Sequence, residues 1–212
     1  MIKGALVGMI QTLVITGVWT KYDVVSLGKD EKKQWRFMAA VGIFTVLLNM
    51  LLFDQEYRIH TLVNLSAVYV IVTILAGIDL KRKVIPNAVL AVGFMVRAIL
   101  MLYEWLAYPE TIRQVFLNMA AGFLFGLLLL LFLSFITRHG IGYGDVKLFA
   151  WLGFSVGLAD TYSILFYSVL AAAITGIYLV FVRKADKKKE LPFAPFVYIG
   201  CCLVFCMTFL GD

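Results

Sequence analysis

Charged residues are scarce in this chain. Only 15% of its 212 residues are Asp, Glu, Lys or Arg, whereas 62% are hydrophobic. A soluble domain is typically about half apolar and about a quarter charged, so an ordinary soluble fold is excluded. Six segments contain no charged residue: Gly4–Thr20, Phe37–Phe53, Thr61–Ile78, Gln114–Thr137, Thr161–Val182 and Leu191–Gly211. Since roughly 17–25 apolar residues suffice for a helix to cross a bilayer, the composition predicts an all-α, polytopic membrane protein.

Cysteine is also scarce. The three cysteines, Cys201, Cys202 and Cys206, all lie in the last uncharged segment. They offer neither the Cys-x-x-Cys spacing of a zinc site nor a disulfide framework. We interpret them as small packing residues, and we predict no metal site.

Two further segments complete a set of about eight predicted spans. Ala88–Ala107 is apolar except for Arg97 and Glu104, and Leu148–Ala159 is short. The stretch from Leu148 to Val182 starts and ends next to basic segments, so it must cross the membrane twice or not at all. We therefore expect two short helices with a turn near Gly157–Asp160. The first segment has no small-x-small cleavage site before Lys21, so we interpret it as a retained span rather than a signal peptide.

Basic residues are distributed very unevenly between the two sides of the membrane. Fifteen of the 19 Lys and Arg residues fall in four alternate connections, which are Lys21–Arg36, Leu80–Asn87, Arg138–Lys147 and Arg183–Glu190. Because basic loops stay cytoplasmic, both termini are expected outside, in a multi-pass protein of the cell membrane. Anionic lipids are the expected partners of this basic face. Nucleic-acid binding is not expected, because the longest loop has only 16 residues.

Two aspartates occur at predicted span edges on the cytoplasmic side. Asp79 directly follows the run ending at Ile78, and Asp145 precedes Leu148–Ala159. Two close carboxylates cannot both ionise cheaply, so they share one proton. The ionised group can activate a water, and the protonated group can assist the leaving group. Such a pair predicts an aspartic peptidase that needs no cofactor.

Each aspartate also has an ordinary interpretation. Asp79 is followed by Leu-Lys-Arg-Lys83 and can be a solvated charge beside basic neighbours. Asp145 can cap the N-terminus of the following helix, where a carboxylate is favourable. The glycines before Asp145 favour the functional alternative, because Gly142 and Gly144 allow another chain to approach closely. In the segment that follows Asp79, Pro86 suits the first turn of the next span.

The two aspartate segments and a third one resemble a known family. Asp79-Leu-Lys-Arg-Lys-Val-Ile-Pro-Asn87 resembles the first aspartate motif of type IV prepilin peptidases, and it includes Ile85, Pro86 and Asn87. Gly142-Tyr-Gly-Asp-Val-Lys-Leu148 resembles their second motif, Gly-x-Gly-Asp-x-Lys-Leu. Pro192-Phe-Ala-Pro-Phe196 is similar to the family's proline-containing signature, with Pro192 and Pro195 as structural candidates.

The resemblance covers about residues 61–200, the expected catalytic core of a single peptidase domain over residues 1–212. It implies cleavage of leader peptides from pilin-like precursors at the cytoplasmic membrane face. Asp79 and Asp145 would be catalytic. Gly142 and Gly144 would shape the cleft, and Lys147 would orient or neutralise a carboxylate or mark the interface. Many members carry two Cys-x-x-Cys pairs between their first two spans and also methylate the product. Lys21–Arg36 has no cysteine, so we expect no methyltransferase activity.

Charges inside a span need an explanation of their own. Glu104 follows Arg97 by two helical turns, on the same face of the predicted helix. Intramembrane charges usually face the bundle interior and pair, so we expect a structural role for both. The alternative to a peptidase is a transporter or channel, with a polar pathway through Asp79, Arg97 and Asp145.

Overall fold

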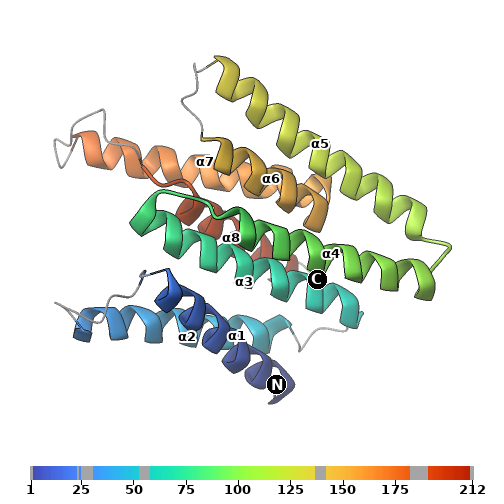
Figure 1. Ribbon diagram of the computed structural model, residues 1–212, viewed down its shortest axis with the longest axis horizontal. Coiled ribbons are helices and arrows are strands. Elements are labelled where there is room, and N and C mark those ends of the chain that lie inside the picture. The colour runs from blue at the N-terminus through green and yellow to red at the C-terminus, as the bar shows by residue number, and fades with distance from the viewer. Residues whose placement is uncertain are drawn as a thin grey trace.

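The residues form a bundle of helices (Figure 1). The computed structural model describes residues 2–22, 24, 31–52, 58–136, 142–181 and 191–210, and these contain eight α-helices and no strand. The helices are α1 (Ile2–Lys21), α2 (Glu31–Leu52), α3 (Ile59–Arg82), α4 (Asn87–Ala107), α5 (Ile112–Ile136), α6 (Tyr143–Val156), α7 (Leu158–Phe181) and α8 (Ala194–Leu210). Within the described ranges, α3, α4, α5 and α7 are long and apolar enough to cross a membrane. The expected polytopic helical bundle is confirmed, while the exact number of spans and the side of the termini stay predictions.

Every uncharged segment lies largely within a helix, but α2 and α6 begin five or more residues earlier than predicted. Helix α2 starts at Glu31, so the end of the segment Lys21–Arg36 is helical and not a loop. Helix α6 starts at Tyr143, five residues before the predicted Leu148. A charged residue ends an apolar run but not a helix, because Glu and Lys are themselves good helix formers. The shift places Asp145 inside the first turn of α6.

The turn predicted within Leu148–Val182 is present at Gly157, and it separates a short helix, α6, of 14 residues from α7, which has 24 residues and is not short as predicted. This residue ends α6 with a φ of 85°, a conformation that residues with a side chain rarely adopt. A Cβ added there would overlap the side chain of Asn118. The Asn118 Oδ1 atom also accepts a hydrogen bond of 3.0 Å from the backbone N–H of Leu158. The glycine therefore lets α6 reverse directly into α7.

Alternate helix ends gather at opposite ends of the bundle (Figure 1). Helices α1, α3, α5 and α7 end where α2, α4, α6 and α8 begin. We call this the basic end, because fifteen of the 19 Lys and Arg residues fall in the four sequence segments that lead from one of these helices to the next. The other end is called the opposite end. This arrangement brings the C-terminus of α3 and the N-terminus of α6 to the same end of the molecule.

Helix α3 is the central element of the bundle. It contacts α1, α4, α6 and α8, and its residues from Ile71 to Asp79 are all buried. Polar contacts join it to its neighbours across the apolar interior. Tyr69 OH lies 3.1 Å from both Thr45 Oγ1 on α2 and Tyr198 OH on α8. The indole of Trp19 on α1 donates a hydrogen bond to Ile74 O. Helix α3 is thus held on three sides.

Candidate active site

The Asp79 side chain is held by the start of α8. Asp79 lies in the last turn of α3 and is only 6% exposed. Its Oδ2 atom accepts a hydrogen bond of 2.9 Å from the backbone N–H of Ala194, the first residue of α8. Amides in the first turn of a helix have no partner within the helix, so one of them is free for Asp79. The carboxylate is therefore fixed by backbone and not by a mobile side chain.

Prolines flank the Ala194 amide. Pro192 precedes α8, and Pro195 is its second residue. The fixed φ of proline suits the first turn of a helix, where no N–H is needed. The two structural candidates of the third motif therefore lie next to the group that binds Asp79, a role that the sequence did not indicate.

After Asp79 the chain turns back sharply. Lys83 ends α3 with φ 52° and ψ 39°, and its N–H donates a hydrogen bond of 2.9 Å to Asp79 O. Residues 84–86 are outside any helix, and α4 begins at Asn87. Pro86, with a φ of −68°, occupies the position just before α4 rather than its first turn. The turn places Ile85 and Asn87 beside Asp79.

The start of α6 brings in the second aspartate. Gly142 precedes the helix, and its carbonyl accepts a hydrogen bond of 3.0 Å from the Asp145 N–H. A Cβ added to Gly144 would lie 3.1 Å from Ile85 Cβ, which is tighter than ordinary van der Waals contact. Gly144 thus lets α6 pack closely against the segment after Asp79. Asp145 is the third residue of α6 and not its cap.

Both carboxylates line one cavity of about 320 Å³ at the basic end. Its lining residues are Asp79, Lys83, Val84, Ile85, Asn87, Gly142, Gly144, Asp145 and Lys147. Of the eight residues predicted for the catalytic and site-shaping roles, all except Pro86 are among them. The sequence reasoning missed Lys83 and Val84, although both lie within the first aspartate motif. It also missed the Ala194 amide, for which no residue-type signal exists.

The electrostatics of the cavity couple the two carboxylates. Burial raises the pKa of Asp145 to about 7, with a further contribution from the nearby charge of Asp79, while a hydrogen bond with the Gly142 backbone opposes the shift. A like charge can have this effect only at short range. Near neutral pH the cavity is therefore suited to hold one proton between two carboxyl groups.

Lys147 bridges two of the helices that build the cavity. Its Nζ atom donates a hydrogen bond of 3.1 Å to Asn87 Oδ1 at the first residue of α4. The bond joins the start of α6 to the start of α4 across the cavity rim. Lys147 and Asn87 therefore lie together at the rim of the cavity. The Lys147 side chain is exposed to solvent there.

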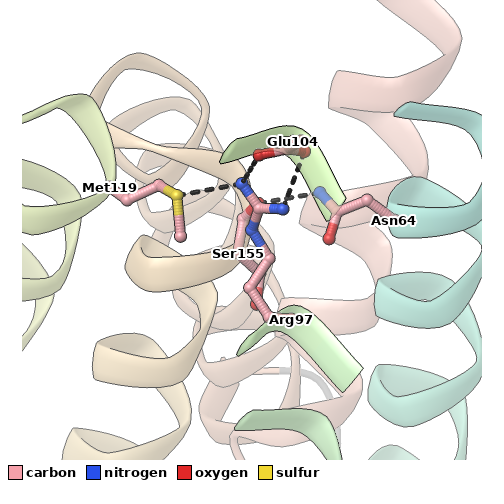
Figure 2. Close-up of polar contacts among 5 residues, drawn as sticks. All are labelled: Asn64, Arg97, Glu104, Met119 and Ser155. Carbon is pink, nitrogen blue, oxygen red and sulfur yellow. Dashed lines mark hydrogen bonds and ion pairs between the residues drawn. The ribbon is translucent and has the colours of Figure 1, made fainter. Parts of the chain in front are cut away.

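The charged pair in α4 lies elsewhere. Arg97 and Glu104 form the expected pair, with bonds of 2.9 Å and 3.1 Å between the guanidinium and the carboxylate (Figure 2). Arg97 also contacts Met119 Sδ at 2.9 Å. The pair lines a separate cavity of about 390 Å³ that includes Gly157, at the opposite end. The transporter alternative requires Arg97 to share a polar pathway with Asp79 and Asp145. Arg97 lines a different cavity from these two aspartates, which does not favour that alternative.

Several bacterial proteins named prepilin leader peptidase/N-methyltransferase are similar to this chain in sequence. It is 36% identical over 136 residues to the prepilin leader peptidase/N-methyltransferase of Bacillus subtilis, which covers 62% of this chain and 50% of that protein. The protein of the same name from Xanthomonas campestris is 30% identical over 132 residues, covering 62% of this chain and 45% of the relative. The Aeromonas salmonicida protein is 40% identical over 63 residues, which is 30% of this chain and 22% of the relative.

The chain spans about half the length of the first two of these relatives. No solved structure matches it. The model of the type IV leader peptidase family matches residues 66–177, which include Asp79, Asp145 and their flanking motifs. The resemblance of the aspartate motifs is therefore confirmed by a match over half of the chain, and the protein belongs to the type IV leader peptidase family.

Proposed function

We propose that the protein is an intramembrane aspartic endopeptidase that removes the leader peptide of type IV pilin-like precursors. The observation that carries this proposal is the position of Asp79 and Asp145 in one cavity, with the charge of one affecting the pKa of the other. The names of the relatives support the substrate class, since they describe prepilin leader peptidases.

The chemistry follows from one proton shared by two carboxyl groups. The ionised aspartate removes a proton from a water molecule, and the oxygen of that water attacks the scissile carbonyl. The protonated aspartate donates a hydrogen bond to the carbonyl oxygen and then passes its proton to the leaving amine. The Ala194 N–H keeps the Asp79 carboxylate in place during these steps. All proton transfers can take place between the two carboxyl groups, the water and the substrate.

We further propose that cleavage occurs at the cytoplasmic membrane face and is not followed by N-methylation. The cavity lies at the basic end, and basic connections favour the cytoplasm. The proposal that methylation is absent rests on the segment Lys21–Arg36, which contains no cysteine. In many members of the family that the chain resembles, the zinc-binding cysteine pairs lie between the first two spans.

The test is a cleavage assay in cells that co-express the protein with a pilin-like precursor. We expect Asp79→Asn and Asp145→Asn each to abolish the shift to the shorter product. Asp160→Asn is the matched control, because Asp160 is a half-buried carboxylate in the first turn of α7 at the opposite end. Normal processing by both cavity variants would refute the dyad. Mass spectrometry of the new N-terminus tests methylation, and a methylated product would refute that part alone.

A further inference from the structure

The opposite end of the bundle has few basic residues, yet three arginines gather around one region of it. Arg58 and Arg97 line the polar cavity of about 390 Å³. Arg113 lines an apolar groove of about 470 Å³ between α4 and α5. Ile112 lines both hollows, so they adjoin. Only Lys3 is a further basic residue of this end within the described ranges. The clustering therefore needs a local explanation.

The polar cavity retains positive character despite the acid inside it. Glu104 is neutralised by the bidentate pair with Arg97, and these side chains are 10% and 5% exposed. The Arg97 Nε atom is buried and has no hydrogen-bond partner among the described residues. Arg58 is exposed at the rim, with its guanidinium 4.5 Å from the ring centre of Tyr108. An unpaired buried donor and a rim cation both favour an anionic ligand.

Three helices add to this positive character. His60 and Thr61 in the first turn of α3, Ile112 at the start of α5 and Gly157 before α7 line the same cavity, although the Leu158 N–H of α7 is already bonded to Asn118. The N-terminus of a helix carries a partial positive charge and amides without partners in the helix. Phosphate groups commonly bind at such termini. A phosphate ester is therefore the anion that suits the cavity.

The adjoining groove is suited to a hydrocarbon chain. It is lined by Ala98, Leu102, Trp105, Ile112 and Phe116, with Arg113 as its charged residue. Trp105 is 58% exposed and Phe116 is 49% exposed, so both contribute free apolar surface. Tryptophan is enriched where bilayer hydrocarbon meets the headgroups. A polar cavity that adjoins an apolar groove has the pattern of a headgroup joined to an acyl chain.

We propose that one anionic phospholipid of the bilayer binds at this site, with its phosphate near Arg58 and Arg113 and an acyl chain in the α4–α5 groove. The site is separate from the cavity of Asp79 and Asp145, so the proposal does not depend on the peptidase function. The occupant is a lipid rather than a soluble phosphate compound because the groove offers hydrocarbon contacts that only a lipid would use.

The test uses the full-length protein purified in detergent and presented with phosphatidylglycerol and phosphatidylcholine in equal amounts. Native mass spectrometry counts the lipid of each kind that stays bound. We expect the wild type to retain phosphatidylglycerol preferentially. Because a basic residue near a membrane surface contributes about 1 kcal/mol to anionic lipid binding, Arg113→Gln should lower retention about fivefold. Lys3→Gln removes the same charge at the same end but outside the site, and it should retain the wild-type preference.

A second variant tests the acyl chain without altering charge. Ala98→Phe fills the groove and should reduce the retention of phosphatidylglycerol, while its melting temperature shows that the protein is folded. Equal effects of Arg113→Gln and Lys3→Gln would mean that only general charge attracts the lipid, and would overturn the proposal. Displacement of phosphatidylglycerol by inorganic phosphate, or full retention by Ala98→Phe, would overturn the assignment to a lipid.

Discussion

Gly122 offers a sharp test of how α6 is held against α5. A Cβ added to Gly122 would lie 2.5 Å from Gly153 O and 2.6 Å from Gly157 C, both backbone atoms of the α6 segment. Real Cβ atoms essentially never lie within 3.0 Å of such neighbours. Because backbone atoms cannot rotate away as a side chain can, Gly122→Ala must push α5 and α6 apart. Small residues that allow this close approach are typical of helix pairs in membranes.

The magnitude follows from two opposing contributions. Overpacking of a tight contact costs about 1–3 kcal/mol, and alanine recovers about 0.5–1 kcal/mol over glycine within a helix. At the midpoints of these ranges the free energy of unfolding falls by about 1.25 kcal/mol, and the extremes give about 0 to 2.5 kcal/mol. For a chain of this size, each kcal/mol shifts the melting temperature by about 2–4 °C. At the midpoint value we expect Gly122→Ala to melt about 2.5–5 °C below the wild type.

The matched control is Gly176→Ala in α7. No atom lies within 4 Å of a Cβ added there, so only the helix preference of alanine remains, and the melting temperature should stay the same or rise slightly. Thermal unfolding of the three proteins in one detergent gives the comparison. If Gly122→Ala melts with Gly176→Ala, the close backbone contact between α5 and α6 is not present in solution.

Three further predictions concern the charged groups. The cleavage rate should fall as the pH rises above about 7, since Asp145 then loses its proton. It should also fall in acid, because both carboxyl groups are then protonated. A flat profile between mild acid and mild base would contradict the shared proton. Lys147→Met should slow cleavage up to about tenfold by removing the bond to Asn87, with partial recovery in Lys147→Arg. Arg97→Met should cost about 3–5 kcal/mol of stability by leaving Glu104 buried and unpaired. Arg97→Met/Glu104→Gln should recover most of that loss in a melting experiment.

The sequence predicted the helices well in the segments that are apolar enough to lie in the bilayer. Backbone groups in hydrocarbon must bond within their own segment, so long uncharged runs predict helices directly. The helix boundaries were less predictable. The uncharged runs begin at Phe37 and Leu148, directly after charged residues, whereas α2 and α6 begin at Glu31 and Tyr143. An apolar pattern reports where hydrocarbon contact starts, not where hydrogen bonding starts.

The candidate site was predictable in its side chains but not in its backbone. Asp79 and Asp145 stand out because recognisable motifs flank them, since a carboxylate at a span edge is by itself ordinary. The amide of Ala194 has no such signal, since every residue except proline has one. Its importance comes from the packing of α8 against α3, which is a property of the tertiary structure.

The hydrogen bond between Asp79 and Ala194 also bears on the order of assembly. Asp79 is synthesised early, on α3, whereas its amide partner belongs to the last helix of the bundle. During translation the carboxylate is synthesised well before the amide that holds it. The hydrogen bond between the hydroxyls of Tyr69 and Tyr198 likewise forms only after α8 has been synthesised. A nascent chain that ends before α8 therefore lacks a fixed first carboxylate. If Asp79 and Asp145 form the proposed catalytic pair, that pair is complete only once synthesis and insertion have reached α8.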